Sequence, residues 1–172
     1  CEMATELLEY MDLGSSLTAT EAECLYTGIL MDTKNFMLKT GVRTFDAASY
    51  LKRLGLNTMS VKRLFNTTKT DYDHKVDIVK TAQEIAPGIA VAKTYEKCPN
   101  IKVVASQAAD DMLNIGNIRA SFVVYPLDNS VSISARSIGD INVQLILEKL
   151  GGGGHMTVAG AQLKDTTIDQ AI

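Results

Sequence analysis

Apolar residues recur every three or four positions through the first half of the chain, the spacing that places them on one face of a helix. One of these helices is preceded by Thr18 and Glu21, which form a capping-box pattern. Thr44 and Thr70 are predicted to begin two others, and Pro87-Gly88 to end the last. The first half is therefore expected to be helical over residues 3–11, 18–31, 44–55, 60–65 and 70–87.

The pattern changes in the second half. Residues 89–95 alternate between apolar and polar as a strand does, and residues 101–113 return to helical spacing. Two strands, 120–125 and 131–136, flank the turn-forming sequence Asp128-Asn129-Ser130 and are predicted to pair as a hairpin. The remaining predicted elements are a helix over 141–149, a strand near 159–163 and a helix from Thr167.

These elements predict an α/β protein in two parts. An α-rich fragment occupies residues 1–66, residues 67–87 form a connector helix, and residues 88–172 form a compact α/β unit, within the usual size of a small domain. With 172 residues, 46% apolar and 22% charged, the chain has the composition of a folded protein. It begins with Cys1 almost inside a helix, so we expect a C-terminal piece of a longer protein.

Charge and cysteine content narrow the functional classes. The net charge of −3 argues against a large non-specific nucleic-acid surface, which normally needs basic charge, but allows a small anionic ligand in one pocket. Cys1, Cys24 and Cys98 are far apart and odd in number, so their spacing indicates neither zinc nor disulfides, and a reducing cytosolic environment is the simplest interpretation. The sequence has no run of about 18 apolar residues, so this chain is expected to make no direct membrane contact.

Four consecutive glycines followed by His155 are the feature that packing explains least. Glycine loses more backbone freedom on folding than any other residue, so such a run suits backbone that approaches a ligand closely or has a positive φ. The bare N–H groups of Gly151, Gly152, Gly153 and Gly154, with the imidazole of His155, would form a cradle for an anion. A flexible loop after a helix C-cap is the alternative, and the run matches no standard phosphate fingerprint.

A second candidate group lies on the strand before that run. Ser132, Ser134 and Arg136 share one face of the predicted strand if the intervening residues face the core. Two hydroxyls and a guanidinium in a row suit a phosphate, although an ordinary solvated strand face is the alternative. The helix and glycine run that follow bring Arg136 and His155 to one edge of the unit.

The first half offers weaker candidates. Asp32 ends an apolar helix beside Thr33 and Asn35, where a carboxylate could bind a divalent cation; a turn-forming aspartate is the alternative. His74 lies in a charged helix start and is predicted to be at the surface. Lys39 precedes a predicted helix start at Arg43 and Thr44, where an anion could bind. A solvated turn is the alternative.

These residues resemble a known family. Gly151–His155 followed by Ala159-Gly160 resembles the glycine-histidine signature of the DHHA1 domain of DHH-type phosphoesterases. Asp32–Phe36 resembles the last metal motif of the preceding DHH domain, and Val131–Ser137 resembles the substrate-facing strand of DHHA1. Together with Lys39–Phe45, these blocks are most similar to the membrane-anchored cyclic-di-AMP phosphodiesterases, in which GGDEF-like and PAS-like modules precede the DHH–DHHA1 pair.

The resemblance implies a fold and a division of the site. Residues 1–66 would be the C-terminal remnant of a DHH domain, and residues 88–172 a DHHA1 domain with a mixed sheet. The family cleaves phosphodiesters with two metal ions, usually manganese. Most of its ligand motifs are absent from this sequence, and Asp32 is the single matching metal ligand. Substrate binding is assigned to Gly151, Gly152, Gly153, Gly154, His155, Arg136 and Ser134.

The resemblance also implies a function for the longer protein. That protein would be a Mn2+-dependent phosphodiesterase acting on a cyclic or linear dinucleotide, anchored to the cell membrane by an absent N-terminal region. This chain would lie in the cytoplasm as its substrate-recognition half, without a complete catalytic site and without bound metal. Its expected partners are a cyclic dinucleotide or short oligonucleotide, the missing N-terminal DHH half and, in a homodimer, a second copy.

Two other interpretations remain open. DHHA1-type domains also occur in single-strand exonucleases, oligoribonucleases and alanyl-tRNA synthetases, so the chain could be a nucleic-acid-binding module, although a strand track usually needs basic charge and stacking aromatics. A dimerising structural half with an empty pocket is the other interpretation. Residues 1–66 would expose apolar helix faces that the absent half covers, so self-association is predicted.

Overall fold

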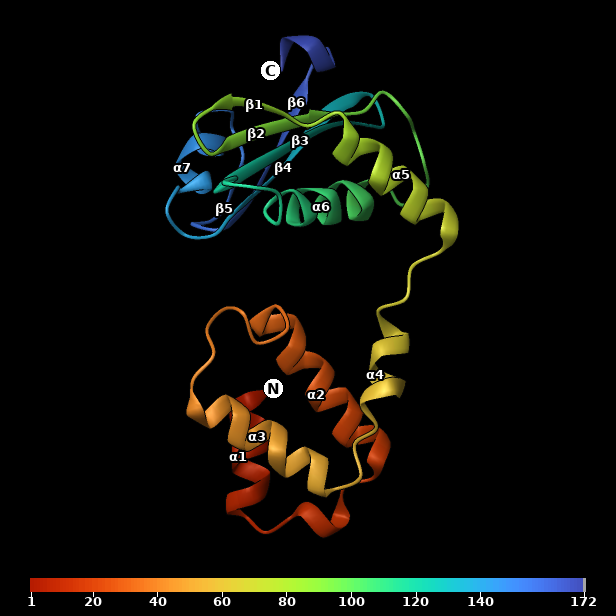
Figure 1. Ribbon diagram of the computed structural model, residues 1–172, viewed down its shortest axis with the longest axis vertical. Coiled ribbons are helices and arrows are strands. Elements are labelled where there is room, and N and C mark those ends of the chain that lie inside the picture. The colour runs from red at the N-terminus through yellow and green to blue at the C-terminus, as the bar shows by residue number, and fades with distance from the viewer. Residues whose placement is uncertain (172) are drawn as a thin grey trace. The chain divides into compact units, whose positions relative to one another are not determined.

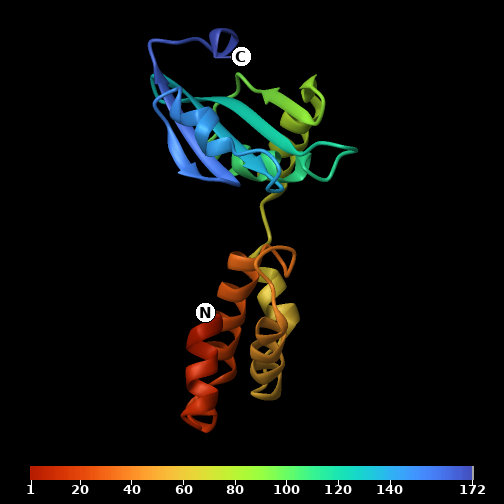
Figure 2. The same ribbon diagram turned by 90° about the vertical axis from the view of Figure 1, so that its left-hand side faces the viewer.

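The computed structural model describes residues 1–171, which form two compact units, Cys1–Asn66 and a larger one that begins at Thr67 (Figures 1 and 2). The smaller unit is helical. Its elements are α1 (Glu2–Tyr10), the 3-10 turn η1 (Gly14–Ser16), α2 (Ala19–Thr33), α3 (Val42–Arg53) and α4 (Thr58–Leu64). The core that these helices enclose consists of Ala22, Ile29, Ala47, Leu51, Leu56 and Val61.

Two predicted helix starts in the smaller unit have different outcomes. The capping box of α2 is confirmed: the Thr18 hydroxyl accepts from the N–H of Glu21 at 3.3 Å, and the Glu21 carboxylate accepts from the N–H of Thr18 at 2.8 Å. The helix expected to begin at Thr44 begins at Val42. Thr44 lies in its first turn, where its hydroxyl accepts from the N–H of Gly41 at 3.1 Å, so it caps the helix from inside.

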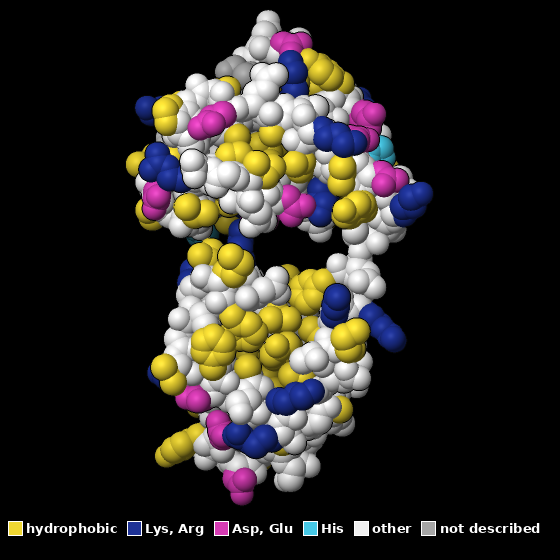
Figure 3. All heavy atoms as spheres, in the orientation of Figure 1, with side chains coloured by type: hydrophobic (Ala, Val, Ile, Leu, Met, Phe, Trp, Pro, Cys, Tyr) yellow, Lys and Arg dark blue, Asp and Glu magenta, His cyan; other side chains and the backbone are white. Residues whose placement is uncertain are grey.

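Large apolar side chains remain exposed on the smaller unit. Figure 3 shows hydrophobic side chains gathered on the face of this unit that points toward the viewer. A surface of this kind favours association with other protein surfaces. The exposed apolar residues of this unit include Met3, Leu7, Tyr10, Val42, Phe45 and Leu64.

The larger unit contains a six-stranded sheet in the order β1-β2-β3-β4-β6-β5. The β2–β3 pair is parallel and the other pairs described are antiparallel, so the sheet is mixed. The predicted α/β class and the β3–β4 hairpin are therefore confirmed. The strands are β1 (Gln83–Ala86), β2 (Ile89–Lys93), β3 (Ala120–Leu127), β4 (Ser130–Ser137), β5 (Gly153–His155) and β6 (Val158–Lys164).

Helices cover both faces of this sheet. They are α5 (Lys69–Lys80), α6 (Ile101–Met112), α7 (Val143–Glu148) and the 3-10 turn η2 (Ile168–Gln170). Helices α5 and α6 cover one face, and α7 and η2 cover the other (Figure 1). Because side chains alternate along a strand, Ile133 and Ala135 of β4 join the core under α7, whereas Ser132 and Ser134 face α6.

The connector helix predicted over residues 67–87 is shorter than expected. Helix α5 begins after Thr68 and ends at Lys80, and Gln83–Ala86 form strand β1. Apolar residues near the end of this segment fit a helix or a strand, so local spacing did not distinguish them. Gly88, with a φ of 77°, allows the chain to reverse and β1 to pair with β2.

Two smaller differences lie near the C-terminus. The glycine run, expected as a loop, contributes the edge strand β5, and the final helix expected from Thr167 is the single 3-10 turn η2. None of the helices found in residues 1–171 has the length and apolar character that a membrane crossing requires.

Candidate functional site

A groove of about 480 Å³ lies between α6 and the part of the sheet formed by β4, β6 and β5. Two cationic side chains, Lys102 and Arg136, line it, and none of the described lining residues is a carboxylate. The lining therefore carries positive charge although the whole chain has a net charge of −3, and this favours an anionic ligand. Polar lining is completed by Ser106, Tyr125, Ser132, Ser134, Gln162 and the backbone of residues 151–153.

Three rows of residues run from α6 across the neighbouring strands, because the step along α6 matches the step along β4. Four helical residues advance about 6 Å, and two strand residues about 6.8 Å. The hydroxyl oxygens of Ser106 and Ser134 lie 3.2 Å apart, and a carboxylate oxygen of Asp110 lies 3.3 Å from Nε of Arg136. Strand register gives the strand members of the three rows, which are Ser132–Gln162, Ser134–Gly160–Gly153 and Arg136–Val158–His155. The helical step then assigns Lys102 to the first row, with Ser106 in the middle row and Asp110 in the third.

Backbone conformation or close packing accounts for three of the four glycines in the run. Gly151 and Gly154 have φ values of 74° and 151°, which other residues rarely adopt. Gly152 passes so close to β6 that a Cβ would lie 2.3 Å from the carbonyl oxygen of Gly160. Gly153 has neither constraint, since a Cβ there would meet no atom within 4 Å. Its missing side chain leaves the floor of the groove open in the middle row.

Arg136 is held in one orientation. Its side chain is only 12% exposed, and its Nη1 donates to the carbonyl oxygen of Ala135 at 2.9 Å. Its Nε donates to Asp110 at 3.3 Å. A guanidinium has five N–H donors, so these two contacts orient Arg136 and leave further donors for a ligand.

The strand register separates one glycine of the predicted anion cradle from the other three. Gly151, Gly152 and Gly153 line the groove with Arg136 and Ser134, whereas Gly154 lies outside this lining and pairs with Ala159 of β6.

His155 lies in the third row, on the same face as Arg136 and two strands away. Neighbouring strands are about 4.8 Å apart, so the two Cα atoms are about 10 Å apart. His155 is exposed and lies outside the set of lining residues. The binding roles of all these residues stay predictions.

Some residues that line the groove were not predicted from the sequence. Lys102, Ser106 and Gln162 were not singled out, although all three line the groove. The sequence spacing could have identified the first two. Lys102, Ser106 and Asp110 are four residues apart, so they lie on one face of a mainly apolar helix. Gln162 had no such signal, since its place in the groove, opposite Ser132, follows from strand register.

Asp32 is exposed near the C-terminal end of α2. The chain then enters three residues with positive φ, stabilised by the hydroxyl of Thr33, which accepts from the N–H of Phe36 at 3.0 Å. Among residues 1–171, no group of three or more His, Cys, Asp or Glu side chains is arranged to hold a metal ion. These residues therefore do not by themselves fit a two-metal site, and we assign them no metal-dependent step.

The helix start at Arg43 and Thr44 binds carboxylates of α1. Arg43 donates to Glu6 from both Nε, at 2.7 Å, and Nη2, and Thr44 donates to Glu2 at 2.6 Å. Hydrogen bonding to Glu6 raises the pKa of Arg43. These intramolecular carboxylates take the positions that an external anion would need.

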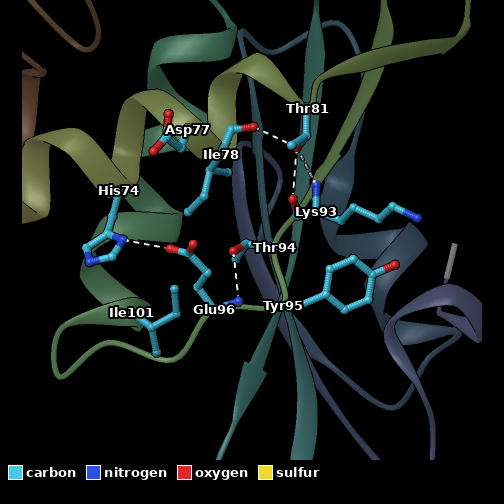
Figure 4. Close-up of a pocket in the computed structure, with 9 residues that line it drawn as sticks. All are labelled: His74, Asp77, Ile78, Thr81, Lys93, Thr94, Tyr95, Glu96 and Ile101. Atoms are coloured by element: carbon cyan, nitrogen blue, oxygen red, sulfur yellow. Dashed lines mark hydrogen bonds and ion pairs between the residues drawn. The ribbon is translucent and has the colours of Figure 1, made fainter.

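A smaller cavity of about 270 Å³ lies where α5 meets the end of β2 (Figure 4). His74, expected at the surface, is half-buried here, with its Nδ1 2.9 Å from the carboxylate of Glu96. The Thr81 hydroxyl donates to the carbonyl of Ile78 and accepts from the N–H of Lys93. Several polar groups of this cavity therefore bind one another, which stabilises the α5–β2 contact.

The glycine-histidine motif and its groove lie in a region that matches a known domain. Residues 90–172 match the DHHA1 domain, so the chain contains a domain of this family. It is 46% identical over 171 residues to the cyclic-di-AMP phosphodiesterase GdpP of Geobacillus thermodenitrificans, covering 99% of this chain and 26% of that protein. The family resemblance drawn from the sequence is thereby confirmed.

Two further comparisons extend this result. The chain is 29% identical to the bifunctional oligoribonuclease and PAP phosphatase NrnA of Bacillus subtilis, covering 94% of this chain and 54% of that protein. The crystal structure of an exopolyphosphatase-related protein from Bacteroides fragilis matches with a TM-score of 0.88 at 21% identity, covering 99% of this chain and 53% of the other. This structural likeness shows the fold alone. The chain spans about a quarter of the length of the GdpP relative.

Proposed function

We propose that this chain is the substrate-recognition half of a metal-dependent phosphodiesterase that hydrolyses cyclic dinucleotides of the cyclic-di-AMP type. The observation that carries the proposal is the open position at Gly153. A groove lined by cations, with a floor cleared of side chains, fits a planar base and its phosphate. The similarity to GdpP supports this substrate class.

The side chains around the opening have complementary roles in this proposal. Arg136 and Ser134 donate to a phosphate, since a guanidinium forms strong charge-assisted hydrogen bonds with phosphate oxygens. Strand β5 is the edge of the sheet, so part of its backbone has no strand partner and can bind the ligand. His155 contributes an imidazole from outside the groove, in the same row as Arg136.

The proposal assigns the chemistry to a longer protein. Manganese ions would supply the activated water there, and Asp32 would be the single ligand that this chain contributes. The chain alone would bind nucleotide without hydrolysing it. The remaining DHH half and a second copy in a homodimer are its proposed protein partners. The longer protein would be held at the membrane with this chain in the cytoplasm.

A binding titration of the 172-residue chain tests the proposal. We expect cyclic-di-AMP to bind more tightly than a linear oligonucleotide of equal charge. Arg136→Gln should weaken binding at least about tenfold, the effect of losing a charge-assisted hydrogen bond. Arg136→Lys keeps a positive charge beside Asp110, so this variant should keep the fold. Lysine lacks the planar guanidinium, so the variant should also bind more weakly. Arg63→Gln, in the smaller unit, is the matched control; unchanged binding in both Arg136 variants would refute the proposal.

The alternative is a nucleic-acid-binding DHHA1 module of a single-strand exonuclease or oligoribonuclease. The likeness to NrnA favours it. Stacking against exposed aromatics normally supports such binding, whereas Tyr125, the aromatic residue among the described groove lining, is only 3% exposed. Tighter binding of the oligonucleotide, with a steep salt dependence, would favour this alternative.

A further inference from the structure

Packing does not explain why a lysine occupies position 102. It is exposed on the first full turn of α6 and, within the described part of the chain, it forms no ion pair or hydrogen bond. Lys75 and Lys93 of the same unit, in contrast, pair with Asp111 and Asp169 at 2.7 Å. The ammonium of Lys102 is therefore available to a ligand in the groove that it lines.

The two cations of the groove are not equivalent. The charge of Arg136 is offset by the carboxylate of Asp110 at 3.3 Å. Lys102 has no ion pair within the described part of the chain, and the strand residues of the first row are Ser132 and Gln162. The first row therefore contributes the uncompensated positive charge of the described groove lining.

The rows also separate these cations along the groove. Lys102 and Asp110 are eight residues apart on α6, which corresponds to about 12 Å between their Cα atoms. Arg136 is held at the Asp110 end by its contacts with that carboxylate and with Ala135. The middle row between the two ends contains serines and glycines only, so it leaves space for a flat group.

We propose that Lys102 binds a second phosphate, so that the groove selects ligands with two phosphates. Lys102 would then be the residue that distinguishes dinucleotides from mononucleotides. This inference rests on the proposed function, because it places the first phosphate at Arg136. It predicts that the contribution of Lys102 depends on the number of phosphates in the ligand.

Titration with cyclic-di-AMP and with adenosine monophosphate tests this inference. Lys102→Gln should weaken cyclic-di-AMP binding about tenfold, the effect of one charge-assisted hydrogen bond, and should leave the binding of the monophosphate within about twofold. Lys149→Gln is the matched control, since Lys149 is an exposed lysine at the end of α7 and lies outside the groove lining.

The outcomes separate the two proposals. An equal loss for both ligands would show that Lys102 and Arg136 share one phosphate, and no loss for either would show that Lys102 does not bind; each result overturns the inference while leaving the proposed function intact. Failure of the unmodified chain to bind cyclic-di-AMP would overturn the proposed function itself. A loss confined to cyclic-di-AMP supports both.

Discussion

Replacing Gly153 by leucine should remove ligand binding without destabilising the protein. A Cβ at this position meets no atom within 4 Å, and φ lies outside the positive region. Glycine inside a strand is less favourable than alanine by about 0.5–1 kcal/mol, so the larger unit should keep its stability or gain up to about 1 kcal/mol. The leucine side chain would nevertheless enter the middle row of the groove, where we place the ligand.

The neighbouring Gly152 should behave in the opposite way. An alanine Cβ there would lie 2.3 Å from the carbonyl oxygen of Gly160 and 2.6 Å from Cβ of Ala161. Both atoms belong to β6, which is paired on both sides and cannot move freely. Overpacking of this kind destabilises by about 1–3 kcal/mol. In a unit of this size, each kcal/mol lowers Tm by about 4–8 °C.

Thermal unfolding and calorimetric titration with cyclic-di-AMP measure the two effects separately. Gly153→Leu should retain Tm and lose at least about tenfold in affinity, or 1.4 kcal/mol. Gly41→Asn is the matched control, because Gly41 also has open space and a negative φ, and asparagine is favoured at a helix N-cap. Normal binding by Gly153→Leu, or a loss in its Tm as large as that of Gly152→Ala, would contradict this prediction.

Three further predictions concern the rest of the chain. Hydrogen bonds from Lys93 and Tyr95 hold the pKa of Asp169 below its ordinary value of 3.8. The ionised carboxylate therefore stabilises the folded state above pH 3.8, and this stabilisation is lost as the pH falls through the lowered pKa. The stability difference between Asp169→Asn and the unmodified chain, measured by chemical unfolding, should therefore shrink from pH 7 to pH 3, and an unchanged difference would contradict the assignment. Thr18→Ala should destabilise the smaller unit by about 1 kcal/mol through loss of the capping box, whereas Thr18→Ser should retain most of it. Light scattering should show concentration-dependent association through the exposed apolar side chains of residues 1–66, and a strictly monomeric chain would count against that role.

The sequence predicted best where local chemistry decides the structure. The capping box at Thr18 and Glu21 and the turn residues between β3 and β4 act on groups within a few positions, so they were recognised without tertiary contacts. It failed at β1, where apolar spacing fits two structures and pairing with β2 selects the strand. The start of α3 was misplaced for a similar reason, since threonine can cap a helix from its first turn as well as from before it.

Within the site as well, local sequence determines some features of the glycine-histidine motif and tertiary structure determines others. The amino-acid sequence alone determined that a glycine run followed by histidine lies after a helix, that Arg136 shares a strand face with two serines, and that both belong to one family signature. Only the tertiary structure decided that Gly153 is the unconstrained member of the run, that His155 lies outside the groove, and that Lys102 joins it. The physical reason is that side-chain clearance and row membership depend on strand register and on the packing of α6 over β4, and these arise from residues distant in the chain.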